Sequence, residues 1–136
     1  MGLKFKKLED FYQVYENHRT YVPPVIRKKH IWNFDEQVWE PGKFEPSRSV
    51  IELGTELFLA YLIAKGLTNF KGVDGDPKTL DYMADNISKK VTVGDIWLTL
   101  DNLTEQFDRI AMLDVFEHFS YFEGQKLLTN LKNNLN

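Results

Sequence analysis

Apolar positions from about residue 49 onward alternate between short continuous runs and longer stretches with helical spacing. The short runs, at 49–53, 70–74, 90–95 and 107–113, have the length and flanking residues of buried strands. The stretches between them carry apolar residues three to four positions apart, as helices do. Because this alternation is typical of βαβ units, we predict an α/β domain with a partial parallel sheet of about four strands.

Residues with known end preferences mark two of the predicted helices. Gly66 follows the apolar segment 57–65 and supplies the left-handed conformation that often ends a helix. Asp76 and Pro77 predict a helix over about 77–85, since aspartate accepts hydrogen bonds from the first helical amides and proline has no amide hydrogen to lose there.

Two further helices are expected nearer the C terminus. Segment 96–103 is interpreted as a short helix. Ser120 and Glu123 have the spacing of a capping box, which predicts that the last helix begins there. The leucines expected on one face of that helix are Leu127, Leu128, Leu131 and Leu135.

The first 46 residues lack a sustained hydrophobic period and are rich in proline and aromatic residues. Residues 8–17 could form a helix, and the remainder is interpreted as an irregular arm held by Trp32, Phe34 and Trp39. Aromatic residues of this kind usually pack onto a domain, although a lid over a substrate is the alternative. We therefore divide the chain into an N-terminal arm, 1–46, and a domain, 47–136.

Composition narrows the classes of function. The chain has 136 residues, 43% of them hydrophobic, which suits one domain with a sizeable core. Its net charge of -3 argues against a protein that tracks nucleic-acid phosphates. There is no cysteine, which excludes disulfides and thiolate metal sites, and no apolar run is long enough to span a membrane. We expect a cytoplasmic protein with neither a nucleic-acid nor a membrane partner.

Polar residues collect where the predicted strands end, which is where open parallel sheets bind ligands. They are Glu52 and Gly54, then Asp74, then Asp95, and finally the segment from Asp114 to His118. Asp74 follows Gly54 by 20 residues, the separation at which a carboxylate reaches the hydroxyls of a bound ribose. A carboxylate in that position can equally cap a helix, so the spacing alone leaves both roles open.

Taken together, these segments resemble the class I S-adenosylmethionine-dependent methyltransferases over about two-thirds of the chain. VIELG is similar to the first motif of that family, GVDGDPKTLDYM to its second strand and helix, VTVGD to its third motif and FDRIAMLDVFEHF to its fourth. A dinucleotide dehydrogenase is less similar, because G-x-G-x-x-G is absent. The resemblance implies a three-layer Rossmann-like fold with strand order 3-2-1-4, S-adenosylmethionine as cofactor, and methyl transfer to an unidentified acceptor.

The resemblance also implies cofactor contacts for residues at the first three strand ends. Asp74 would bind the ribose, and Asp95 would receive the adenine edge together with the backbone of Ile96. Glu52 and Gly54 would lie beside the methionine part of the cofactor.

Three residues after the fourth strand complete the implied site. Leu113 and Asp114 would border the pocket near the sulfonium. His118 could serve as a general base for acceptors that must lose a proton, but a histidine at the start of a helix is more often a cap or a surface residue.

Two departures from the family pattern suggest an alternative. The glycine-rich turn after Glu52 is about two residues shorter than the pattern and lacks its later glycines, and Glu56 brings a negative charge towards the methionine carboxylate. The resemblance also implies seven strands, so the fourth strand here would be an apolar edge that invites a homodimer, a partner chain or the arm. The alternative function is a degenerate, non-catalytic interaction module that dimerises through this edge.

Overall fold

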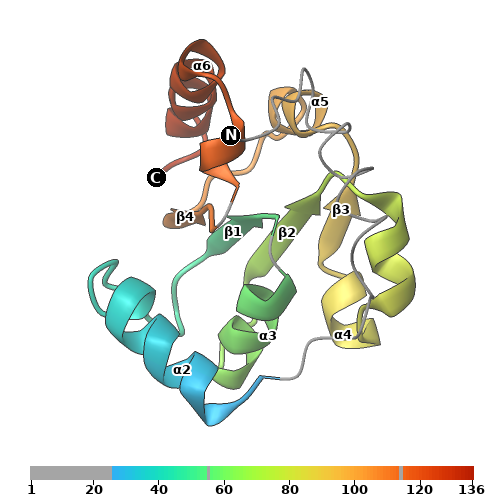
Figure 1. Ribbon diagram of the computed structural model, residues 1–136. Helices are drawn as coiled ribbons and strands as arrows, with labels where there is room; N and C mark the ends of the chain where they lie inside the picture. Colours follow the sequence, from blue (N-terminus) through green and yellow to red (C-terminus); the bar gives the residue numbers. More distant parts are fainter. Residues whose placement is uncertain (1–25, 55, 114) are drawn as a thin grey trace, which may run out of the picture.

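A four-stranded parallel sheet lies at the centre of the computed structural model, which describes residues 26–54, 56–113 and 115–136 (Figure 1). Its strands are β1 (Val50–Leu53), β2 (Phe70–Asp74), β3 (Val91–Val93) and β4 (Arg109–Ala111). All neighbouring pairs are parallel, and the order across the sheet is β3-β2-β1-β4. The predicted strands and their order are confirmed.

Helices cover both faces of this sheet, which confirms the three-layer prediction (Figure 1). They are α2 (Lys28–Phe34), η1 (Asp35–Trp39), α3 (Glu56–Ala64), η2 (Pro77–Tyr82), α4 (Asp85–Ser88), α5 (Ile96–Asp101), η3 (Phe116–His118) and α6 (Tyr121–Lys132). α2, α3 and α4 lie on one face, and α5 and α6 lie on the other. Within the described ranges, no helix has the length and apolar character needed to cross a membrane.

Side chains of β1 alternate between two apolar cores. Val50 belongs to the α3-side core with Phe58 and Leu62, whereas Ile51 and Leu53 belong to the core under α5 and α6. This alternation is what a strand buried on both faces produces. It also directs Glu52 towards α3, where its side chain is fully buried.

Segment 28–39 is helical, so the prediction of an irregular arm is wrong there. α2 continues directly into the π-helix η1, in which the Glu40 amide donates to the Asp35 carbonyl at 2.9 Å. Phe34 and Trp39 pack against Tyr61 of α3, with ring centroids 5.0 and 5.9 Å away. The two predicted anchors are therefore confirmed as packing residues.

Trp32, the third predicted anchor, is 64% exposed and is not one. It lies between Ile31 and Phe34 on the helix, and those two residues face the α3-side core instead. The predicted helix over 8–17 lies outside the described residues.

The helix predicted over 77–85 is wrong as a single element. Asp76 caps its beginning as expected, with its carboxylate accepting from the Lys78 amide at 3.0 Å. Met83 then adopts an extended conformation, with φ -79° and ψ 144°, and buries its side chain in the α3-side core. That change of direction separates η2 from α4, since an extended residue ends a helical turn.

α6 begins at the predicted capping box, where Ser120 Oγ accepts from the Glu123 amide at 3.2 Å. Leu127 and Leu131 are buried, but Leu128 and Leu135 are 50% and 41% exposed, so the prediction of one shared face is wrong. Leu128 is turned about 100° from Leu127, and Leu135 follows the end of the helix.

Candidate functional site

The carboxyl ends of β1, β2 and β3 form one continuous edge, here called the carboxyl edge. Leu53 is in register with Val73, so the next residues, Gly54 and Asp74, lie side by side. The Gly54 amide donates to the Val73 carbonyl at 2.9 Å, and the Gly94 amide donates to the Asp74 carbonyl at 3.0 Å. Gly54 and Asp74, 20 residues apart in the sequence, therefore lie at the ends of adjacent strands.

Gly54 turns the chain from β1 into α3. Its φ is +97°, a conformation that residues with a Cβ rarely adopt. Only two residues separate the end of β1 from the start of α3, which agrees with the contracted turn expected from the sequence. The backbone is bare of a side chain at the point where a ligand above β1 would approach it.

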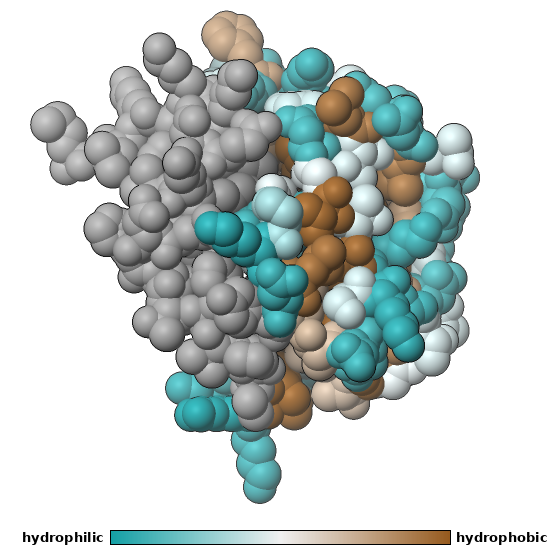
Figure 2. Space-filling model, turned by 90° about the vertical axis from the view of Figure 1, so that its right-hand side faces the viewer, coloured by the Kyte–Doolittle hydropathy of each residue, from teal (hydrophilic) through white to brown (hydrophobic). Residues whose placement is uncertain are grey.

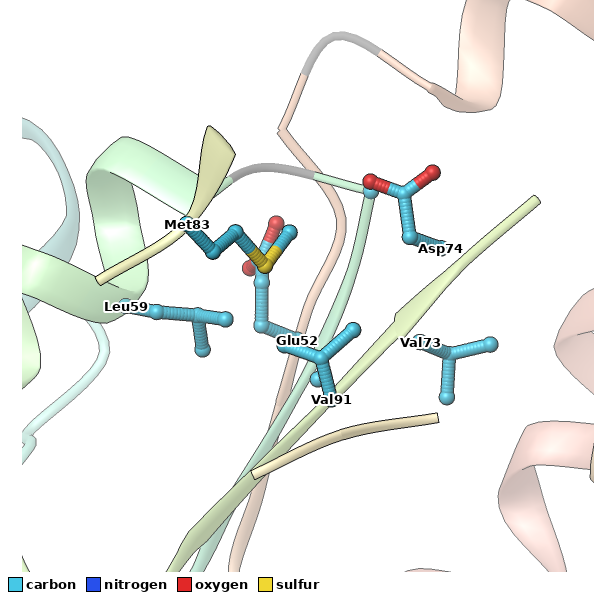
Figure 3. A pocket seen from close by; sticks show the side chains of 8 residues that line it. Glu52, Leu59, Val73, Asp74, Met83 and Val91 are labelled. Atoms are coloured by element: carbon cyan, nitrogen blue, oxygen red, sulfur yellow. The ribbon is translucent and has the colours of Figure 1, made fainter. Parts of the chain in front are cut away.

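Asp74 is held in a fixed orientation at the end of β2. The side chain is 7% exposed, and its Oδ1 accepts from the Asp76 amide at 2.8 Å. The residue that caps η2 is Asp76, two positions further along the chain. The contact of Asp74 with a ribose stays a prediction. Figure 3 shows the Asp74 carboxylate at the strand end, away from the buried Glu52.

A small cavity lies below the carboxyl edge, between α3 and the sheet. Its volume is about 10 Å³, and it is lined by Glu52, Gly54, Leu59, Gly72, Val73, Asp74, Met83 and Val91. In Figure 3, the side chains of Glu52, Leu59 and Met83 converge there. Since a cavity needs roughly 10–15 Å³ to hold one water molecule, this cavity has room for at most a single water and for no group of a ligand.

Gly72 allows α3 to pack closely on β2 beside this cavity. A Cβ at this position would lie 2.7 Å from Leu59 Cδ1 and 3.1 Å from Val91 Cγ2. Our sequence reasoning did not assign Gly72, Leu59, Met83 or Val91 to the site. The signal for Gly72 was present, because an isolated glycine within a strand often marks a close approach.

Asp95 and Ile96 begin α5 immediately after β3. Asp95 Oδ1 accepts from the amides of Trp97 at 2.9 Å and Leu98 at 3.1 Å, so the carboxylate caps the helix. The Ile96 side chain is buried in the core under α5 and α6. Their contact with an adenine ring stays a prediction.

The predicted residues after β4 are less closely grouped. Leu113 packs against the α3-side core, and Asp114 lies outside the described residues. His118 is the last residue of η3, with Nε2 3.8 Å from Glu117 Oε1, and it does not line the described cavity. The structure thus brings Gly54, Asp74 and the buried Glu52 together, with His118 outside that group.

Carboxylates dominate the described side chains at the carboxyl edge. Glu52, Asp74 and Asp76 are all buried, and Asp95 caps the next helix. The exposed Lys78 follows on η2. An excess of negative charge attracts cationic groups and repels phosphates.

The chain matches no family model and none of the curated proteins. Among solved structures, it is similar to coclaurine N-methyltransferase bound to N-methylheliamine and S-adenosylhomocysteine, with a TM-score of 0.60 and 16% identity. The chain has the fold of a class I methyltransferase. The chain is also similar to the structure of an S-adenosylmethionine-dependent methyltransferase from Geobacter sulfurreducens in complex with S-adenosylhomocysteine, with a TM-score of 0.58 and 12% identity.

Both matches cover nearly all of this chain but only part of the other protein. The alignments span 98% and 97% of this chain, and 43% and 53% of the two methyltransferases. The chain therefore spans about half the length of the methyltransferase-fold structures that it matches.

Proposed function

We propose that the chain binds S-adenosylmethionine at the carboxyl edge and takes part in methyl transfer to an acceptor that is still unidentified. The observation that carries the proposal is the adjacency of Gly54 and Asp74 across β1 and β2, within a methyltransferase fold. Gly54 would let the cofactor approach the backbone, and Asp74 would accept hydrogen bonds from the ribose hydroxyls.

The charge of the site fits this cofactor better than a phosphate-bearing nucleotide. Sulfonium and ammonium groups are cationic and would be attracted by the Asp74 carboxylate at the carboxyl edge, which would repel a pyrophosphate. The cofactor would lie across the carboxyl edge, because the cavity beneath that edge is too small to admit one of its groups.

The residues of this chain would act mainly by positioning. S-adenosylmethionine supplies the activated methyl group, and the protein gains rate by holding the reacting atoms in line and away from water. The Asp74 carboxylate is already oriented by the hydrogen bond from the Asp76 amide, and Gly54 is fixed by the hydrogen bond from its amide to the Val73 carbonyl. His118 stays a candidate general base for acceptors that lose a proton.

The test is calorimetric titration of the full chain with S-adenosylmethionine and S-adenosylhomocysteine, comparing wild type with Asp74→Asn. Asparagine keeps the Oδ1 acceptor for the Asp76 amide but removes the charge. Hydrogen bonds to a charged group contribute about 1.5–3 kcal/mol, so Kd should rise roughly tenfold to a hundredfold. Asp101→Asn, at the exposed end of α5, is the control and should leave Kd unchanged.

The same titration separates the enzyme from the alternative, a non-catalytic interaction module. The two-residue turn after β1 and the small cavity are the observations that favour the module. Saturable binding with a raised Tm would support the cofactor proposal, since a ligand that binds only the folded state stabilises it. No binding at millimolar cofactor would leave the module as the better description.

A further inference from the structure

Gly124 lies near the start of α6, at a helical position where glycine is unexpected. It is the fourth residue of the helix, and its amide donates to the carbonyl of the capping residue Ser120 at 2.8 Å. Glycine forms helices less readily than alanine, so a glycine inside a helix usually has a packing or functional reason. Gly124 does not have a positive φ, so the backbone conformation does not require it. The reason therefore lies in the space around it.

That space is filled by the Phe116 ring of η3. A Cβ at position 124 would lie 3.1 Å from Phe116 Cζ, closer than the roughly 3.5–4.0 Å at which carbon atoms pack best. Gly124 is buried, whereas Phe116 is 41% exposed. Hydrophobic residues in small groups are common at protein surfaces, as the described part of the face in Figure 2 shows. The exposure of Phe116 thus needs no explanation, but the glycine against its ring does.

The cap of α6 shows what this glycine changes. An apolar residue just before a helix cap often packs against the fourth residue of the helix. In α6 these two residues are Phe119 and Gly124, and glycine offers no side chain for that contact. Phe119 instead lies against Trp97 of α5, with ring centroids 5.7 Å apart. The place beside Gly124 is left to Phe116.

Two ring contacts therefore hold η3, one at each end. Phe116 is its first residue, and Phe119 follows its last residue, His118. The His118 amide donates to the Val115 carbonyl at 3.0 Å, and the Phe119 amide donates to the carbonyl of Phe116 at 3.2 Å. So short a turn is not stable by itself, because fixing its backbone costs more free energy than its few hydrogen bonds return. The ring contacts thus determine where η3 lies.

The position of η3 decides where the His118 side chain lies. The chain passes from β4 through η3 into α6, and Ala111, the last residue of β4, is in register with Glu52 of β1 (Figure 1). η3 therefore follows the strand end next to that of β1. The His118 side chain is 26% exposed, and its Nε2 lies 3.8 Å from Glu117 Oε1. A half-buried imidazole in this place can still be reached by an acceptor from solvent.

We propose that Gly124 is a positioning residue for the proposed methyl transfer. Because it has no side chain, the Phe116 ring packs against α6 and fixes His118 where it can take a proton from the acceptor. The proposal rests on the proposed function, in which His118 is the candidate general base. A displacement of about 1 Å can cost roughly a hundredfold in rate, since a base acts only within hydrogen-bond reach of the proton.

The first test is NMR of the ligand-free wild-type chain and of Gly124→Ala. Wild type should show nuclear Overhauser effects between the Phe116 ring protons and the α protons of Gly124. In Gly124→Ala the ring must move, so most of this intensity should be lost and the His118 ring signals should shift. Thr129→Ala, at an exposed position of α6, is the matched control and should leave both unchanged. Unchanged His118 signals in a folded Gly124→Ala chain would overturn the proposal.

A compensating variant separates positioning from a general disturbance of α6. Phe116→Leu leaves a gap against Gly124 and should also shift the His118 signals. In Gly124→Ala/Phe116→Leu the smaller side chain makes room for the added methyl group, so the signals should return most of the way to their wild-type positions. Such non-additivity is expected only of residues in contact. A double variant that is disturbed as much as the two single changes together would refute the proposal.

The link to function is tested with S-adenosylhomocysteine as the probe. When wild type is saturated with it, the His118 ring signals should shift. Calorimetry of Gly124→Ala should give a Kd close to that of wild type, because Gly54 and Asp74 lie on other elements, but the variant should lose most of the shift at His118. Bound S-adenosylhomocysteine that leaves the His118 signals of wild type unmoved would overturn the proposal. No binding by wild type would instead refute the proposed function, and the ligand-free spectra would still decide whether Gly124 positions η3.

Discussion

At the scale of single residues, Gly72 is a position where the fold depends directly on the absence of a side chain. Gly72→Ala would place a Cβ 2.7 Å from Leu59 Cδ1 in a closely packed layer. Such overpacking costs about 1–3 kcal/mol, which should lower the urea midpoint of unfolding.

Gly94→Ala is the matched control for this substitution. The nearest atom to its Cβ would be Thr99 Oγ1 at 3.4 Å, an ordinary contact, and Gly94 does not have a positive φ. Its urea midpoint should stay near that of wild type. Equal losses in the two variants would contradict the packing argument.

The residues of the candidate site were predictable where a local rule fixes them. Gly54 and Asp76 follow rules of backbone conformation and capping, and both are confirmed in those structural roles. Met83 and Leu59 line the cavity only because separate elements meet there, and no local pattern encodes that meeting. Asp95 shows why a local rule does not identify a ligand contact. Its carboxylate caps α5 whether or not it also contacts a ligand.

At the scale of elements, η1 is held to α3 by a half-buried polar contact beside an aromatic cluster. Tyr61 Oη donates to Asp35 Oδ1 at 2.5 Å, and Lys65 Nζ lies 2.9 Å from the same oxygen. Tyr61→Phe keeps the ring contacts with Phe34 and Trp39 but removes the hydroxyl donor. The free energy of unfolding should fall by about 1.5–3 kcal/mol, as expected for a hydrogen bond to a charged group.

Tyr121→Phe is the control for that prediction. Its ring is 74% exposed, and its hydroxyl accepts from Gln125 at the surface. Urea unfolding of the two variants should therefore show a large loss only for Tyr61→Phe. Similar midpoints for both variants would show that the Asp35 contact does not stabilise the arm.

The same cluster explains why the arm escaped sequence-based prediction. A π-helix forms hydrogen bonds five residues apart, so η1 interrupts the 3.6-residue period by which helices are recognised. That wider turn brings Phe34 and Trp39, five positions apart, to the same tyrosine. By contrast, β1 to β4 were predictable because strands buried on both faces are continuous apolar runs.

At the scale of the whole molecule, two carboxylates join segments that are distant in sequence. The pKa of Asp35 is lowered below its ordinary value of 3.8, mainly by the hydrogen bond from the Tyr61 hydroxyl and secondly by the hydrogen bond from Lys65. The pKa of Asp108 is also lowered, mainly by the hydrogen bond from the Ser49 amide and secondly by the hydrogen bond from the Asn136 side chain. One contact ties the N-terminal helices to α3, and the other ties the start of β1 to both β4 and the C terminus.

These shifts predict how stability depends on pH. A carboxyl whose pKa is lower in the folded chain stabilises it above the unfolded value of 3.8, and the contribution is lost as the pH falls through the folded pKa. The urea midpoint should therefore drop steeply below about pH 4. The double variant Asp35→Asn/Asp108→Asn should be less stable than wild type at pH 6 but lose less stability on acidification. If its acid dependence were as steep as that of wild type, other carboxyls would control acid unfolding.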